Sequence, residues 1–202
     1  MLNFYFLLFI LGVNIKKRIV EEGSDKLEFD RKECYEMVKL RLARLEEIQI
    51  AMDIINTAKT HLKEQGIDQW QTGYPDYNCI KKDIEFEKGF FVVDDENILG
   101  YLCVDYDGEP AYKDMHGKRN TSENYVVVHR MAFTGNARGK GISSITFRLV
   151  EELSKERGIS SFRVDTDADN KKMQQILQKN GFSYCGTIWF DNSEKIAFDK
   201  KF

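Results

Sequence analysis

The stretch Tyr125-Val-Val-Val-His-Arg-Met-Ala-Phe133, followed by Thr134-Gly-Asn-Ala-Arg-Gly-Lys-Gly-Ile-Ser-Ser144, predicts a strand, a glycine-bearing loop and the start of a helix. The first part is rich in β-branched residues, which is typical of a strand. The start of a helix offers free N–H groups and the positive end of the helix dipole. Arg138 and Lys140 add positive charge at the same place. The sequence therefore predicts that residues 138–144 bind an anion, such as the pyrophosphate of a larger ligand.

Two known phosphate-binding motifs compete for this loop. A Walker loop needs four residues between its first glycine and the Gly-Lys pair, whereas Gly135 and Gly139 enclose only three. Gly141 also stands where the magnesium-binding hydroxyl should follow, so the Walker motif is excluded. The dinucleotide fingerprint fits better, because Gly139 to Ser144 reads G-x-G-x-x-S after a strand and Asp165 ends the next strand. A nicotinamide-dinucleotide-binding protein therefore stays open as a rival.

A third motif is the acetyl-CoA loop R/Q-x-x-G-x-G/A, whose defining positions are occupied by Arg138, Gly141 and Ser143. Further along, Asn170-Lys-Lys-Met-Gln-Gln-Ile-Leu-Gln-Lys-Asn-Gly-Phe182 is similar to N-x-x-A-x-x-L-Y-x-x-x-G-F. On these two motifs, in this order, the chain resembles the GNAT superfamily of N-acetyltransferases. It departs from the family pattern at Leu177, which stands in place of the tyrosine, and less severely at Ser143.

Composition sets the class of protein. The chain has 202 residues, 42% of them hydrophobic, which is enough for one domain with a core. The net charge of −3 argues against a nucleic-acid partner, because such proteins usually carry a basic surplus. Four cysteines, Cys34, Cys79, Cys103 and Cys185, lack the spacing of a zinc site or a disulfide scaffold. They indicate a reducing compartment, and we expect the cytoplasm.

The N-terminal segment differs from the rest of the chain. Residues 2–13 are nearly all apolar, but the run is shorter than the roughly 20 residues that span a bilayer. Basic residues 16–18 follow it, which would suit a weak surface anchor, yet an extension or a segment packed on the domain is favoured over membrane contact. We therefore predict an extension over 1–33, apolar and then charged, and an N-acetyltransferase domain over 34–202.

The remaining chain predicts the order β-α-α-β-β-β-α-β-α-β-β. The predicted strands cover residues 38–43, 90–93, 98–106, 125–133, 161–165, 182–190 and 195–202, and the predicted helices cover 45–63, 76–87, 142–157 and 170–180. Asp76 is expected to cap the second of these helices. Residues 107–124 are predicted to be a long loop. The expected fold is α/β (α+β), with a mixed, mostly antiparallel twisted sheet of about seven strands flanked by helices. Hairpins on both sides of a single βαβ unit disfavour the dinucleotide rival.

The resemblance implies that an acetyl group passes from acetyl-CoA to a primary amine by direct attack in a ternary complex, without a metal. It implies that the loop amides hold the pyrophosphate and that the end of the preceding strand pairs with the pantetheine arm. Asn170 maps onto an asparagine that contacts this arm, although an ordinary helix N-cap competes with that role. The cofactor-binding residues expected on this basis are Met131, Ala132, Phe133, Arg138, Gly139, Lys140, Gly141, Ile142, Ser143, Ser144 and Asn170.

The proton-transfer groups are harder to assign. His129 is the candidate general base, because its ordinary pKa suits the task and it lies two residues before the pantetheine-pairing segment. A hydrogen-bonded structural histidine is the alternative. Strand alternation is expected to place His129 and Met131 on one face and Arg130 on the other. With Leu177 unable to donate a proton, Tyr184 is a candidate acid, or the thiolate leaves without one.

The sequence does not identify the acceptor amine. Trp70, Tyr74 and Asp105 are candidate acceptor-lining residues, and aromatic rings with an acid would suit a small-molecule or peptide amine. The acidic run Asp165 to Asn170 imitates the start of a calcium loop but lacks its glycine and its final glutamate, so it is interpreted as a strand end and a helix cap. The alternative function is a non-catalytic CoA-binding or sensory domain. A homodimer is also considered.

Overall fold

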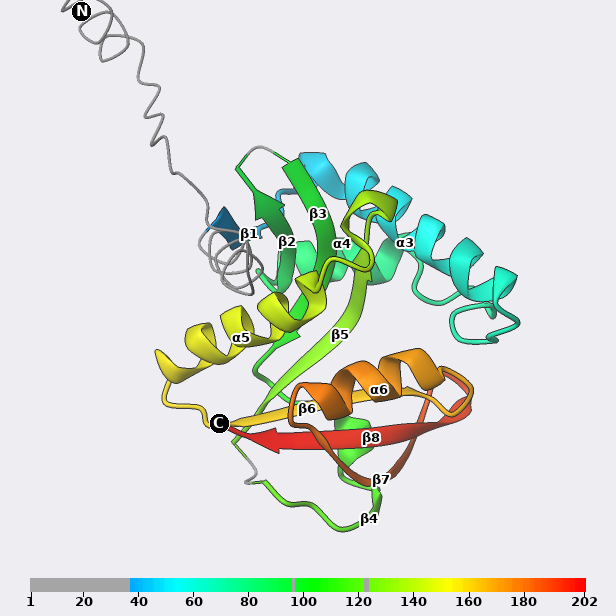
Figure 1. Cartoon of the computed structure of the whole chain (residues 1–202), viewed down its shortest axis with the longest axis vertical. Coiled ribbons are helices and arrows are strands. Elements are labelled where there is room, and N and C mark those ends of the chain that lie inside the picture. Colours follow the sequence, from blue (N-terminus) through cyan, green and yellow to red (C-terminus); the bar gives the residue numbers. More distant parts are fainter. Residues whose placement is uncertain (1–36, 96, 122–123) are drawn as a thin grey trace, which may run out of the picture. The chain divides into compact units, whose positions relative to one another are not determined.

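The fold is organised around one open sheet, seen in a computed structural model that describes residues 37–95, 97–121 and 124–202 (Figure 1). The predicted N-terminal extension over 1–33 and Cys34 lie outside the described residues. The sheet has eight strands in the order β1-β2-β3-β5-β6-β8-β7-β4, and only the β5–β6 neighbours run parallel. The predicted mixed, mostly antiparallel sheet is thus confirmed.

The elements follow the predicted order. The strands are β1 (Val38–Leu42), β2 (Gly89–Asp94), β3 (Asn97–Asp105), β4 (His116–Gly117), β5 (Val126–Phe133), β6 (Ser161–Asp167), β7 (Ser183–Phe190) and β8 (Ser193–Lys201). The helices are η1 (Leu45–Glu47), α3 (Ile48–Glu64), α4 (Tyr77–Glu85), η2 (Pro110–Tyr112), η3 (Gly135–Ala137), α5 (Ile142–Lys155) and α6 (Lys171–Lys179). Within the described ranges, none of these helices is long and apolar enough to cross a membrane.

The eighth strand corrects the prediction of a plain loop over 107–124. This segment contains η2 and the two-residue strand β4, whose His116 and Gly117 pair with Thr187 and Gly186 of β7. The two glycines approach so closely that a Cβ on Gly117 would lie 2.2 Å from the Cys185 carbonyl oxygen. Such a short pairing has no sequence pattern of its own, because it depends on a distant partner strand.

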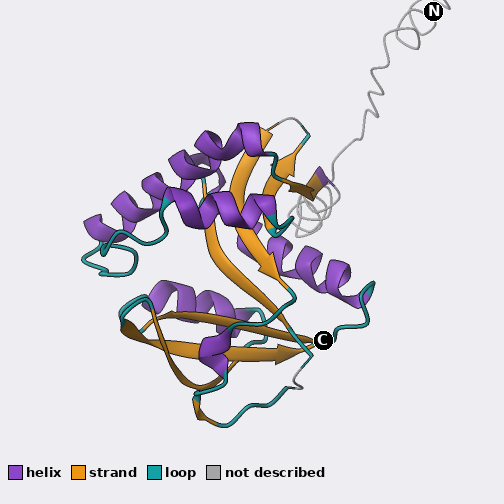
Figure 2. Ribbon diagram, turned by 180° about the vertical axis from the view of Figure 1, so that it is seen from behind, coloured by secondary structure: helices purple, strands orange, loops and turns teal. Residues whose placement is uncertain are grey.

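Helices cover both faces of the sheet. Figure 1 shows α5 and α6 in front of the strands, and the reverse view in Figure 2 brings α3 and α4 to the front. A buried cluster under α3 and α4 includes Ile55, Ile80 and Phe91. On the α5 side, the rings of Phe147 and Phe162 pack at 5.8 Å between centroids. These two apolar layers hold the strands of the sheet in place between the helices.

The parting of β5 and β6 is the feature that positions the site. These strands run parallel but pair only through Val126 with Phe162 and Val127 with Arg163. Beyond that point β5 continues for six residues to Phe133 without a partner on its β6 side among the described residues. A gap between neighbouring strands leaves backbone N–H and C=O groups unpaired on the edge, so a ligand with amide groups could pair there.

The start of α4 gives a prediction for stability. Asp76 is the N-cap, and its side chain accepts a hydrogen bond from the Cys79 amide at 2.8 Å, as its position in the sequence predicted. Asp76→Ala is expected to lower the free energy of unfolding by about 1 kcal/mol, because the helix amide loses its acceptor. Asp76→Asn keeps an acceptor oxygen and should stay close to wild type. Urea denaturation of the three proteins measures the difference, and equal stability of all three would contradict the role of this cap.

Candidate active site

The predicted anion-binding loop forms the start of α5. Gly139 and Gly141 have φ values of 77° and 78°, a region that side chains rarely adopt, and a Cβ built on either glycine meets no atom within 4 Å. Gly141 is the N-cap of α5. The amides of Ile142 and Ser143 donate to no backbone acceptor among the described residues, so they are available to a ligand. The Ser144 amide is not, because it donates to the Gly141 carbonyl oxygen at 3.0 Å.

A long cleft of about 320 Å³ runs from this loop between α3, α6 and the end of β5. Its basic lining residues are His61, Arg138, Lys172 and Lys179. Burial, together with the charges of Arg138 and Lys172, lowers the pKa of His61. Arg138 Nη2 is buried and has no hydrogen-bond partner among the described residues. An orphaned buried guanidinium nitrogen at the end of a basic cleft fits an anionic ligand that would supply the missing acceptor.

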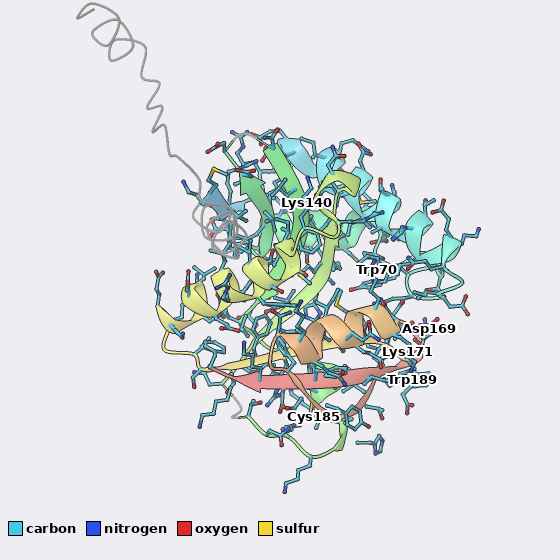
Figure 3. The ribbon with its side chains drawn as sticks, viewed as in Figure 1. Trp70, Lys140, Asp169, Lys171, Cys185 and Trp189 are labelled. Carbon is cyan, nitrogen blue, oxygen red and sulfur yellow. The ribbon has the colours of Figure 1, made fainter. Side chains whose placement is uncertain are left out.

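Lys140 does not share this position. Its side chain is exposed and does not line the cleft, although the sequence placed it among the cofactor-binding residues. Figure 3 shows Lys140 at the loop before α5, and Trp70 between α3 and α6. Of the predicted cofactor-binding residues, the structure brings Met131, Ala132, Phe133, Arg138, Gly139, Gly141, Ile142, Ser143, Ser144 and Asn170 together as lining of the cleft.

A bulge in β5 corrects the predicted alternation of side chains. His129 pairs with Cys103 and Ala132 pairs with Tyr101, so two residues of β5 stand opposite Leu102 alone. Arg130 takes a φ of 53° within this bulge. As a result His129, Arg130 and Met131 all line one small cavity, whereas strict alternation would have put Arg130 on the opposite face. Bulges of this kind re-aim side chains beside functional sites.

The Arg130 side chain is tied down inside the fold. Its guanidinium donates to both carboxylate oxygens of Asp83, at 2.8 and 2.6 Å, and to the Tyr74 hydroxyl at 2.6 Å. Asp83 also accepts from the Tyr101 hydroxyl at 3.1 Å. These contacts join α4, the 65–76 connection and β5 beneath the small cavity. The bulge therefore positions a structural ion pair, and it leaves the cavity lining without an unpaired arginine.

Asn170 is the N-cap of α6, as the helix-cap interpretation predicted. Its side-chain oxygen accepts from the Met173 amide at 3.0 Å, and its amide group donates to Gln69 Oε1 at 2.7 Å. Gln69 Oε1 also accepts from the Thr166 hydroxyl at 3.2 Å. These hydrogen bonds of Gln69 fasten the α3–α4 connection to the end of β6 and the start of α6. Asn170 remains a lining residue of the cleft in addition to this capping role.

The small cavity, of about 60 Å³, adjoins the long cleft, because Gln69, Trp70, Met131 and Met173 line both. His129 lies in its wall, 9% exposed, with Nε2 at 3.9 Å from Glu109 Oε2. Burial lowers the pKa of His129 to about 3, and the charges of Arg130 and Lys88 act in the same direction. Its imidazole is therefore neutral at neutral pH, since its pKa lies well below that pH.

Asp165 is a site residue that the sequence reasoning assigned only to a strand end. It lines the small cavity, and its Oδ2 accepts a hydrogen bond from the Tyr112 hydroxyl at 3.4 Å. Burial, together with the nearby Glu109 carboxylate, raises the pKa of Asp165 to about 6 against the opposing charge of Lys195. The available signal was its place at the open end of β6, next to the strand that carries the loop.

The remaining candidates divide into two groups. Trp70 and Tyr74 line the small cavity as predicted. Asp105 lines neither hollow, because its carboxylate is bound by Lys88 Nζ at 2.9 Å and by the Asp107 amide. Tyr184 is 59% exposed, packs edge-on against Phe198, and also lines neither hollow. The structure therefore does not bring Asp105 or Tyr184 to the site.

The fold matches that of known acetyltransferases. The family model of the acetyltransferase (GNAT) family matches residues 54–182. A GNAT-family acetyltransferase from Streptococcus agalactiae is 31% identical, with 82% of this chain and 95% of that chain covered and a TM-score of 0.75. One from Listeria monocytogenes is 18% identical, with 82% and 95% covered and a TM-score of 0.67. The chain belongs to the GNAT acetyltransferase family.

A more distant neighbour shares the fold alone. The aminoglycoside acetyltransferase AAC(6')-Ib, solved in complex with coenzyme A, is 14% identical, with 81% of this chain and 94% of that chain covered and a TM-score of 0.62. A comparison with curated proteins gave no match.

Proposed function

We propose that this protein transfers an acetyl group from acetyl-CoA to a primary amine of a small molecule or peptide. The observation that carries the proposal is a pair of adjoining hollows where β5 and β6 part. The cleft has the free amides of α5 and the orphaned Arg138 nitrogen, and the small cavity beside it is lined by Asp165 and aromatic rings. A long anionic cosubstrate and a small cationic acceptor would meet where the two hollows join.

The residues of the cleft fit acetyl-CoA without a metal. The Ile142 and Ser143 amides and Arg138 would hold the diphosphate, and the unpaired edge of β5 from Met131 to Phe133 would pair with the amide groups of the pantetheine arm. Bound acetyl-CoA supplies the thioester that the amine attacks. The complex of AAC(6')-Ib with coenzyme A supports this assignment, because that protein has the same fold.

His129 can act as a base only within limits set by its surroundings. The low pKa keeps the imidazole neutral and able to accept a proton, but the same low pKa makes it a weak acceptor for an ammonium proton. Leu177, which stands at the position of the usual tyrosine, is fully buried, and Tyr184 lies away from both hollows. We propose that the thiolate leaves unassisted, as a thiol pKa near 8.5 allows.

Two measurements test the proposal and its alternative. Calorimetric titration of the wild-type protein with acetyl-CoA should give saturable binding, and absence of binding would remove the proposal. A screen of primary amines for release of free CoA then separates an enzyme from a non-catalytic CoA-binding domain, because turnover of any amine excludes the latter. A nicotinamide-dinucleotide-binding protein is disfavoured, because its fold needs a mostly parallel sheet and this sheet has one parallel pair of strands. A cytoplasmic location and a homodimer stay predictions.

Two basic residues of one loop make a sharper test. Arg138→Met is expected to weaken acetyl-CoA binding by about 10- to 100-fold, because a charge-assisted bond to phosphate contributes roughly 1.5–3 kcal/mol. Lys140→Met removes the same charge from an exposed side chain outside the cleft, and it should change the Kd by less than about threefold. Calorimetry at fixed ionic strength compares the two variants, and equal losses would place the ligand outside the cleft.

A further inference from the structure

The small cavity is shaped to receive something much smaller than the ligand of the long cleft. Its volume is about 60 Å³, against about 320 Å³ for the cleft. Gln69, Trp70, Met131 and Met173 line both hollows, so the small cavity lies directly beside the cleft. Only a slender group fits, so the acceptor must present its reactive atom at the tip of a narrow chain.

The walls of this cavity are aromatic. Tyr74 packs edge-on against Phe190 at 5.5 Å between centroids, and His129 stacks on Phe190 at 6.3 Å. Trp70 adds a third ring at the junction with the cleft, and it is held there with a φ of 67°. Aromatic faces attract a cation and also pack against methylene groups. The walls therefore suit an alkyl chain that ends in a positive charge.

The charges at the floor are negative. Asp165 and Glu109 approach this region from β6 and from the residue before η2, and the neutral imidazole of His129 offsets neither carboxylate. The two cations of the lining are already paired. Arg130 is bound to Asp83, and Lys195 lies 2.5 Å from an Asp167 oxygen. An entering ammonium group would therefore offset part of this negative charge.

We infer that the cavity admits the unbranched end of a primary alkylammonium ion and that Asp165 binds the ammonium group and accepts its proton. This inference rests on the proposed acetyl transfer and names its acceptor class. One N–H proton of the ammonium passes to a carboxylate oxygen of Asp165. The freed lone pair forms a C–N bond to the acetyl carbon, and the C–S bond breaks with its electron pair on sulfur. The second proton lost by nitrogen converts the thiolate to a thiol, and the proton on Asp165 returns to solvent.

The pH dependence follows from the surroundings of Asp165. Glu109 from its capping position, Tyr112 of η2, Asp167 of β6, Lys195 of β8, His129 of β5 and Tyr74 of the α3–α4 connection are the titratable groups that face it. Asp165 must be ionised to accept a proton. Because burial raises its pKa to about 6, kcat/KM for an amine should fall as the pH drops through that region. This fall of kcat/KM near pH 6 should be absent when the carboxyl group of Asp165 is removed.

A fluorescence titration tests the acceptor class directly. The chain has two tryptophans, and Trp189 is 69% exposed at the β7–β8 hairpin in Figure 3, so Trp189→Phe leaves Trp70 as the reporter in the cavity. With CoA bound, n-butylamine hydrochloride should change Trp70 emission saturably. Its isomer tert-butylamine, with the same charge, and neutral 1-butanol should bind at least about tenfold more weakly. Equal responses to all three, or none to n-butylamine, would overturn the inference.

The role of Asp165 is tested on the same reporter protein. Asp165→Asn should weaken n-butylamine binding about 10- to 100-fold and abolish the limb near pH 6 in its acetylation, while CoA affinity stays unchanged. Asp165→Glu should restore part of the binding. Asp114→Asn makes the same chemical change on an exposed loop and should match the parent. Normal CoA binding with unaltered amine binding in Asp165→Asn refutes this inference alone, whereas loss of CoA binding by the parent protein refutes the proposed function.

Discussion

Gly141→Glu is expected to abolish measurable acetyl-CoA binding, with a Kd raised at least about 100-fold. Gly141 is the N-cap of α5, and the direction of its missing Cβ is open space at the anion site. A glutamate there would project a negative charge toward the free Ile142 and Ser143 amides, where it would compete with and repel the diphosphate. Calorimetry of the purified variant measures the loss.

Gly158→Glu provides the matched control for this variant. Gly158 has a φ of 71°, close to the 78° of Gly141, and a Cβ there also meets nothing within 4 Å. Both substitutions should therefore destabilise the fold by a similar amount, about 1–2 kcal/mol, through left-handed backbone strain. Gly158 follows the other end of α5, away from the cleft lining. If Gly158→Glu bound acetyl-CoA as poorly as Gly141→Glu, strain rather than the anion site would explain the loss.

Asp83→Ala is expected to lower the free energy of unfolding by about 3–5 kcal/mol, because it leaves the buried Arg130 guanidinium without its counter-ion. The Arg130 and Asp83 side chains are 12% and 7% exposed and are joined by two short hydrogen bonds. The Tyr101 hydroxyl loses its acceptor at the same time. Urea denaturation measures the change.

Another carboxylate of α4 supplies the comparison. Glu85 forms an ion pair with Lys81 in which both side chains are 44% exposed, so Glu85→Ala should cost at most about 1 kcal/mol. A double variant, Asp83→Leu with Arg130→Met, removes both buried charges and should recover much of the stability that Asp83→Ala loses. A loss below about 1 kcal/mol for Asp83→Ala would mean that water, rather than Asp83, stabilises Arg130.

Local patterns in the sequence predicted their elements well. Asp76 was identified as a cap because its acceptor oxygen needs only an amide three residues away, and the structure has that bond. The strand before the loop and the helix after Gly141 were likewise predicted, since alternation, helical spacing and glycine placement are properties of neighbouring residues. The same reasoning failed at Arg130, where a bulge interrupts the alternation. A bulge is set by how two strands pair, so one strand alone does not reveal it.

The candidate site likewise combines residues that the sequence predicted with residues that only packing brings together. The cleft residues near 138–143 follow each other in the chain, and the sequence found them. Asp165 was seen only as a strand end, because its partners Glu109, Tyr112 and Lys195 come from distant segments and raise or lower its pKa only once they are packed together. Tyr184 was chosen as an acid from its residue type, but in the fold it is exposed and outside both hollows.

By itself, the sequence determined the family of this protein, because the loop around Gly141 and the Asn170 to Phe182 segment are contiguous motifs whose spacing carries the information. It also determined the order of the longer helices and strands, though not the two-residue strand β4, since hydrophobic periodicity is local. Only the tertiary structure decided where β5 and β6 part, and which carboxylate reaches the small cavity. Those outcomes depend on hydrogen bonding and burial between segments far apart in the chain, which form together when the sheet closes against its helices.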